Sequence, residues 1–158
     1  KINFKLPGGN GFLPHQDAPA FNSFDQTYHI TMMVSIDPCN KENGCLEMVP
    51  GHHRQGILPT AADATIDPDI AETLSWELLP SEIGDIVFFD SYIPHRSAPN
   101  GSEQPRRALY ITYNRASEGS YREKYYRCKR DIFPPDIERD PKKDYQDSGV
   151  FNVGNPIK

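Results

Sequence analysis

The chain has 158 residues, enough for one domain with a sizeable core and too few for two comfortable ones. Its composition, 37% hydrophobic and 25% charged, is typical of a soluble globular protein, and its 15 prolines and 11 glycines favour short strands and frequent turns. The net charge of −5 argues against nucleic acid as a partner. No apolar run approaches the roughly 18 residues of a membrane-spanning helix, so we expect no membrane partner.

Cysteine usage bears on the cellular compartment. Cys39, Cys45 and Cys128 leave one cysteine unpaired in any intramolecular scheme, and the sequence has no CxxC pair. No signal-peptide pattern opens the chain, so we predict reduced thiols in a cytoplasmic protein, with a Cys39–Cys45 disulfide as the open alternative. The chain begins at Lys1 inside an apparent strand, which is consistent with a fold truncated at its N-terminus.

Segments of strand character begin with the first residues. Residues 2–6 alternate between apolar and polar side chains, and a turn follows at 7–11. Residues 28–37 and 45–51 are rich in apolar and β-branched residues, and the turn between them predicts that they pair as a hairpin. Further strands are predicted at 76–80, 86–90 and 106–114.

Two segments favour helices. A short helix is predicted around Pro68–Ser75, where Pro68 suits the first turn. An amphipathic helix is predicted at 117–133, with Ser117 as its cap. Residues 134–158 are rich in proline and charge and are predicted to form an extended tail.

The order of these segments predicts the fold class. Several short strands separated by turns favour a mainly β (α+β) domain, a sandwich or barrel with a helix added at its C-terminal end. We expect residues 1–116 to form the core of this domain, with the helix at 117–133 and the tail at 134–158 belonging to the same domain.

His15 and Asp17 lie two positions apart in the stretch LPHQDAPAF at residues 13–21. On a strand, residues i and i+2 point to the same face, so both side chains can aim at one point inside a barrel. His95 follows the strand predicted at 86–90 and offers a third ligand at the rim. Two histidines and one carboxylate are the facial triad of non-haem Fe(II) oxygenases, so the sequence predicts a metal site.

An arginine pair opens the strand predicted at 106–114. A 2-oxoacid co-substrate needs a fixed cation for its distal carboxylate, and arginine supplies a planar fork that stays charged. Arg106 and Arg107 are neighbours on a strand, so they face opposite sides of the sheet and only one can reach the pocket.

Four stretches together resemble the phytanoyl-CoA dioxygenase family of Fe(II)/2-oxoglutarate oxygenases. They run in the family's order and near its spacing: HQD (15–17), NGCLEMVPGHH (43–53), GDIVFFDSYIPHRS (84–97) and RRALYITYN (106–114). The resemblance spans residues 2–115, which is most of the chain. It implies a double-stranded β-helix, the jelly-roll or cupin-like barrel of two facing sheets. It also implies an enzyme that uses Fe(II), 2-oxoglutarate and O2.

The resemblance also implies roles for individual residues. The family's spacing favours Arg106 over Arg107 for the far carboxylate of 2-oxoglutarate. Ser97 would add a hydrogen bond and Lys5 a charged contact to this co-substrate. A turn residue at Ser97 and a solvated lysine at Lys5 are the plainer alternatives. The iron ligands of the family correspond to His15, Asp17 and His95.

The implied reaction is hydroxylation of an unactivated C–H of a small, anionic metabolite, with succinate and CO2 as co-products. An aspartate at position 17, where related halogenases have a small residue, favours hydroxylation over halogenation. Arg96 and Met33 depart from the family's pattern and are expected to reshape the substrate pocket. With Arg54, Arg96 favours a phosphonate or carboxylate, and FFDSYIPHRSAP is similar to the aminophosphonate-hydroxylase branch.

Two other functions stay open from the sequence. A cupin-like barrel could hold another metal for non-oxidative chemistry, although such a protein would not need Arg106 at this spacing. A non-catalytic binding module with a decayed site is the second alternative. The sequence predicts neither the identity of the substrate nor the oligomeric state.

Overall fold

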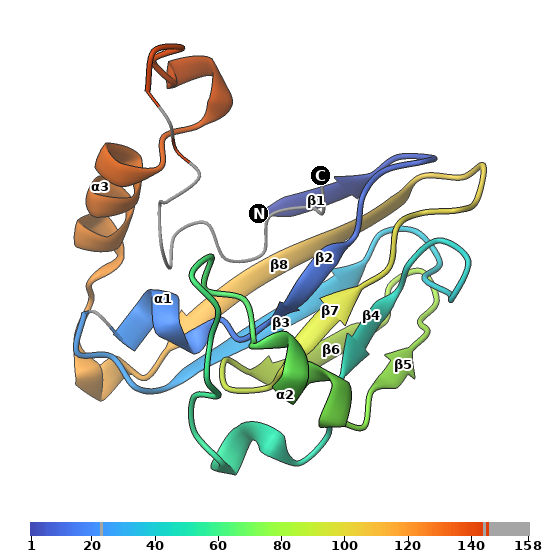
Figure 1. Cartoon of the computed structure of the whole chain (residues 1–158), viewed down its shortest axis with the longest axis horizontal. Helices are drawn as coiled ribbons and strands as arrows, with labels where there is room; N and C mark the ends of the chain where they lie inside the picture. Colours follow the sequence, from blue (N-terminus) through green and yellow to red (C-terminus); the bar gives the residue numbers. More distant parts are fainter. Residues whose placement is uncertain (23, 144, 146–158) are drawn as a thin grey trace.

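The computed structural model describes residues 1–22, 24–143 and 145, and its centre is a pair of four-stranded antiparallel sheets (Figure 1). The first sheet has the order β1 (Ile2–Lys5), β8 (Arg106–Asn114), β3 (His29–Ser35), β6 (Ile86–Asp90). The second has the order β2 (Phe12–His15), β7 (His95–Ser97), β4 (Leu46–Met48), β5 (Glu77–Leu79).

Most connections carry the chain from one sheet to the other. β1, β3, β6 and β8 belong to the first sheet, and the strands between them along the chain belong to the second. This crossing pattern is that of a jelly roll. The prediction of a mainly β fold, a double-stranded β-helix of two facing sheets, is therefore confirmed.

The apolar core is one cluster of side chains packed between the two sheets. Along β3, buried side chains alternate with half-buried ones, as expected for a strand with one face in the core. The core cluster takes side chains from both sheets: Met33, Leu46, Met48, Phe89, Ile93 and Ala108.

The predicted hairpin of residues 28–37 with 45–51 is wrong. β3 pairs with β8 and β6 in the first sheet, whereas β4 pairs with β7 and β5 in the second. The turn between β3 and β4 carries the chain across the core instead of reversing it within one sheet. Turn residues predict that the chain changes direction, but they do not say into which sheet it goes.

Three short elements were not predicted. β2 contains Pro14 and β7 directly follows Pro94, and proline argues against a strand in most sequence patterns. The sequence FLPH of β2 does not alternate, and β7 is too short to show alternation. The helix α1 (Ala18–Asn22) is equally short. These are the elements around the HQD motif and His95.

The helices agree only in part with the prediction. α2 (Pro68–Thr73) lies where a short helix was expected, with Pro68 in its first turn. α3 (Arg122–Ile132) begins later than predicted, because Ala116–Glu118 forms a separate 3₁₀ turn that ends at Gly119 with φ 83°. Ser117 therefore does not cap the helix. Two other 3₁₀ turns are His52–Arg54 and Asp136–Glu138.

The tail predicted at 134–158 falls mostly on residues outside those described, and its described part contains the 3₁₀ turn just named. The division into a core at 1–116, a helix and a tail stays a prediction.

All three cysteines are free, so Cys39 and Cys45 are not bonded to each other. Within the part of the chain that the structure describes, no helix is both long and apolar enough to cross a membrane.

Candidate metal and co-substrate site

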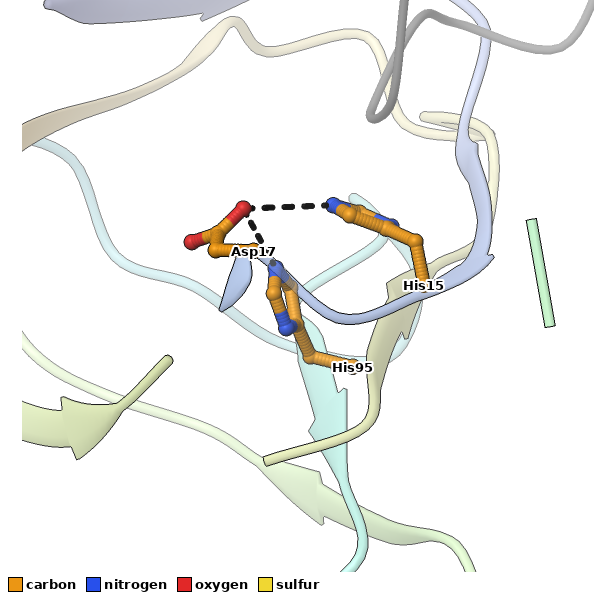
Figure 2. A group of neighbouring side chains, drawn as sticks. All are labelled: His15, Asp17 and His95. Carbon is orange, nitrogen blue, oxygen red and sulfur yellow. Dashed lines mark ion pairs between the residues drawn. The ribbon is translucent and has the colours of Figure 1, made fainter. Parts of the chain in front are cut away.

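Three side chains converge where the strands β2 and β7 lie side by side (Figure 2). His15 ends β2, His95 begins β7, and the two residues are partners in the pairing of these strands. Their rings lie 4.1 Å apart between centroids. Asp17 follows β2, and its Oδ1 lies 3.9 Å from the Nε2 atom of each histidine.

Gln16 explains how His15 and Asp17 come to face the same point. Asp17 lies beyond the end of β2, so the strand alone does not orient it, contrary to our interpretation of the HxD spacing. The Gln16 amide is buried and donates to the carbonyls of Gly56, at 3.0 Å, and Tyr92, at 2.6 Å. Its Oε1 accepts a hydrogen bond from the backbone N–H of Leu58. These bonds fix the residue between the two candidate ligands.

The two imidazoles have defined tautomers. Nδ1 of His15 lies 2.7 Å from the carbonyl of Leu13, and Nδ1 of His95 lies 3.0 Å from the carbonyl of Ile93. A carbonyl oxygen only accepts, so each Nδ1 carries the proton and donates. In a neutral ring, Nε2 then carries the lone pair, and both Nε2 atoms face Asp17.

Burial sets the charge of His15. Burial, and after it the neighbouring His95, lowers the pKa of His15 to about 4. The imidazole of His15 is therefore neutral at pH 7, as a metal ligand must be.

These residues fit a divalent metal. One ligand atom from each of His15, Asp17 and His95 can be chosen so that all lie within 4.8 Å of one another. Two imidazole nitrogens and one carboxylate form the donor set of a facial triad, and backbone carbonyls hold both rings in orientation. The same donor set also suits zinc or manganese, so it does not identify the metal by itself.

The triad lines a cavity of about 300 Å³ between the sheets. Arg106 and Ser97 line the same cavity. The roles predicted for these residues stay predictions, but the structure brings the three candidate ligands and two of the three candidate co-substrate residues to one place.

Arg106 has the features of an anion-binding residue. It is only 2% exposed, and its Nε and Nη2 have no hydrogen-bond partner among the described residues. Burial alone would lower its pKa, but the neighbouring Tyr110 and Cys39 outweigh it and raise the pKa. Buried N–H groups without an acceptor are costly, so the free donors of this guanidinium suit an anion that enters the cavity.

Arg107 faces the other side of the sheet. Its guanidinium donates to both carboxylate oxygens of Asp37, at 2.8 Å and 2.7 Å. Arg107 does not line the cavity. Of the two neighbours, Arg106 is therefore the one that can reach a co-substrate.

Ser97 and Lys5 are joined to each other. Lys5, on β1, is buried, and its Nζ donates to Ser97 Oγ at 2.8 Å and to the carbonyls of Gly44 and Ala98. Burial, and after it the charge of Arg106, lowers the pKa of Lys5 to about 8. Lys5 does not line the cavity. Its three protons already have acceptors, whereas the hydroxyl proton of Ser97 stays available to a ligand.

The three residues predicted to contact substrate have different surroundings. Arg96 lines the cavity, but its guanidinium binds Glu47 at 2.8 Å and stacks on Trp76. Met33 is fully buried in the core cluster, and Arg54 is exposed; neither lines the cavity. The structure does not bring Met33 and Arg54 to the site.

Other cavity residues were missed from the sequence. On β8, every second residue from Arg106 points inward, so Tyr110, Thr112 and Asn114 line the cavity. Their period of two could have been used to find them. One face of α3 also lines the cavity, and no residue of this helix was proposed for the site.

Comparisons with known proteins agree with this geometry. The family model of phytanoyl-CoA dioxygenase (PhyH) matches residues 1–108. The chain is 53% identical over 159 residues to a 2-aminoethylphosphonate dioxygenase of uncultured bacterium HF130_AEPn_1, covering 100% of this chain and 61% of that protein. It is 48% identical to a methylphosphonate hydroxylase of Gimesia maris, covering 84% of this chain and 50% of that protein.

Solved structures show the same fold. EvdO2 from Micromonospora carbonacea var. aurantiaca, complexed with 2-oxoglutarate, has a TM-score of 0.62 at 29% identity and covers 73% of this chain and 50% of that one. EctD from S. alaskensis has a TM-score of 0.59 at 22% identity, over 74% of this chain and 43% of that one. The chain thus spans about half to three-fifths of the length of the curated relatives just named.

Proposed function

Because the chain belongs to the phytanoyl-CoA dioxygenase family, we propose that it forms the catalytic core of an Fe(II)/2-oxoglutarate-dependent dioxygenase that hydroxylates a small phosphonate. Succinate and CO2 are the co-products. One observation carries this proposal: a buried arginine, two of whose nitrogens have no hydrogen-bond partner among the described residues, lines the same cavity as a His–Asp–His cluster.

His15, Asp17 and His95 would hold the metal. The bound Fe(II) would supply the chemistry that couples oxidative decarboxylation of 2-oxoglutarate to oxidation of a C–H bond by O2. The two backbone carbonyls that accept from Nδ1 keep both rings turned toward the metal position. Asp17 adds a negative charge that offsets the charge of the cation.

Arg106 and Ser97 would bind the co-substrate. The planar guanidinium of Arg106 can donate two parallel hydrogen bonds to the far carboxylate of 2-oxoglutarate. Ser97 accepts from Lys5 and can donate its own proton to the same carboxylate. Lys5 therefore acts through Ser97 as a positioning residue.

The charge of the cavity supports an anionic substrate. Its lining includes one carboxylate, that of Asp17, and five cationic side chains: Lys1, Arg96, Arg106, Arg122 and Lys129. The two relatives named above act on phosphonates, according to their names. A phosphonate carries up to two negative charges on a compact group, which suits such a lining.

Turnover of 2-oxoglutarate tests the proposal. Protein reconstituted with Fe(II) is given 2-oxoglutarate and O2, with methylphosphonate, 2-aminoethylphosphonate or a matched carboxylate as substrate. We expect succinate in a one-to-one ratio with a hydroxylated phosphonate, and none of either with Arg106→Gln. Turnover with a carboxylate alone would contradict the substrate class. No turnover with any substrate by iron-loaded protein would contradict the dioxygenase and favour non-oxidative chemistry or a binding module.

A further inference from the structure

The helix α3 turns one face toward the cavity. The residues of this face recur with helical spacing and all line the cavity: Tyr121, Arg122, Tyr125, Tyr126 and Lys129. In Figure 1, α3 stands next to α1, at one end of the two sheets. Tyr125 fixes this position, since its ring lies 5.6 Å from the rings of Phe21 on α1 and of Phe24 just after it.

This part of the cavity carries positive charges that form no ion pair with a described residue. Arg96 binds Glu47, and Arg106 is assigned to the co-substrate. Arg122, Lys129 and Lys1 take part in no ion pair among the described residues.

Lys1 and Lys129 line the same cavity as Asp17 and interact electrostatically with it. Burial, and after it the charge of Lys1, lowers the pKa of Lys129. Burial also lowers the pKa of Lys1, and the carboxylate of Asp17 partly opposes the shift in both lysines. Two ammonium groups that repel each other beside one carboxylate gain most from a ligand with two negative charges.

The helix α3 lies outside the residues that the general family model matches, whereas the metal and co-substrate candidates lie inside them. The match to the general family model ends at residue 108, before α3 begins at Arg122. The match to the 2-aminoethylphosphonate dioxygenase covers 100% of this chain and therefore includes α3. The candidate ligands and the candidate co-substrate residues all lie between Lys5 and Arg106, within the residues that the general family model matches.

We propose that Lys129 and Arg122 of α3, together with the side chain of Lys1, form the subsite that binds the phosphonate group of the substrate. The inference rests on the function proposed above and assigns the substrate specificity of that same cavity to α3. Three cationic donors can satisfy the three oxygens of a phosphonate. The tyrosines of the same face cover the adjacent carbon and exclude water from it.

Direct binding of methylphosphonate tests the subsite. The probe is titrated calorimetrically, without O2, into protein loaded with Fe(II) and 2-oxoglutarate. The variants are Lys129→Gln and Arg122→Gln, with Lys129→Arg as the conservative replacement. Arg127→Gln is the matched control, because Arg127 is exposed on the same helix and does not line the cavity. Unfolding in urea checks that each variant folds like the wild type.

We expect Lys129→Gln and Arg122→Gln each to weaken methylphosphonate binding about tenfold or more. Arg127→Gln should stay within about twofold, Lys129→Arg should retain most of the affinity, and 2-oxoglutarate affinity should not change in any variant. Unchanged methylphosphonate binding in the two glutamine variants, or no binding by the wild type, would overturn the subsite. Binding that depends on α3 without any hydroxylated product would leave the subsite standing and refute the proposed reaction instead.

Discussion

At the scale of single residues, a step of one position along β8 separates two arginines with different surroundings. Arg107 faces outward and has Asp37 as its partner. Arg106 faces the cavity and has two buried nitrogens for which the described part of the chain offers no hydrogen-bond partner. The period of two in a strand predicts that the two arginines differ, and the structure shows which of them faces inward.

Replacing Arg106 should remove co-substrate binding. Arg106→Gln deletes the only charge available to the far carboxylate in our account, and we expect the Kd for 2-oxoglutarate to rise about 100-fold or more. Arg107→Gln should change that Kd less than about threefold, because Arg107 does not line the cavity and surface ion pairs have small effects. Both values can be measured by calorimetry without O2. Equal losses in the two variants would contradict the assignment.

Lys5 should contribute to stability more than an exposed lysine. Lys5→Met leaves the carbonyls of Gly44 and Ala98 and the Ser97 hydroxyl without their donor inside the protein. We expect the free energy of unfolding to fall by about 2–4 kcal/mol, from two or three buried acceptors without a partner. The exposed Lys41 provides the control, and Lys41→Met should have an effect within about 0.5 kcal/mol. Urea titrations of both variants check this, and equal midpoints would refute the structural role.

At the scale of elements, the site depends on short segments held by the connections around them. The turn between β3 and β4 crosses from one sheet to the other, and Gly44 in this turn has φ +70°. A Cβ added at Gly44 would lie 2.1 Å from the backbone oxygen of Ala98. The same turn presents the Gly44 carbonyl to Lys5, so its backbone helps to fix Ser97.

Gly44→Ala should therefore destabilise the fold more than an alanine at another glycine of similar backbone conformation. Gly56 has φ +78° and open space around its Cβ position, so Gly56→Ala suffers only the strain of the left-handed conformation, about 1–2 kcal/mol. Gly44→Ala adds a collision with backbone and should lose at least about 2 kcal/mol more. Thermal unfolding of the two variants makes the comparison. Equal melting temperatures would show that the turn can move without cost.

At the scale of the whole molecule, the sequence predicted the fold class and the residues that meet at the site better than it predicted the path of the chain. The strands at 86–90 and 106–114 were found at the bounds of β6 and β8, because long apolar or alternating runs carry a strong signal. The hairpin of β3 with β4 was wrong, because which sheet a strand joins depends on contacts distant in sequence.

The residues of the site were also predicted only in part. The metal and co-substrate candidates sit in recognisable motifs and were named from the sequence. Gln16, Tyr110 and the cavity face of α3 were not proposed for the site, since their contribution comes from packing and from where a helix lies against the sheets. Met33 was expected at the pocket from the family's pattern and Arg54 from its charge, and neither residue lines the cavity.

Formation of the ternary complex of protein, Fe(II) and 2-oxoglutarate tests the central claim most directly. Fe(II) and then 2-oxoglutarate are titrated into the protein without O2, and the visible charge-transfer band between iron and the 2-oxoacid is followed. We predict a band that saturates at about one equivalent of each, is lost in His95→Ala, and is kept in the control His53→Ala, whose histidine does not line the cavity. Iron binding without the band, or a band that survives in His95→Ala, would contradict this account.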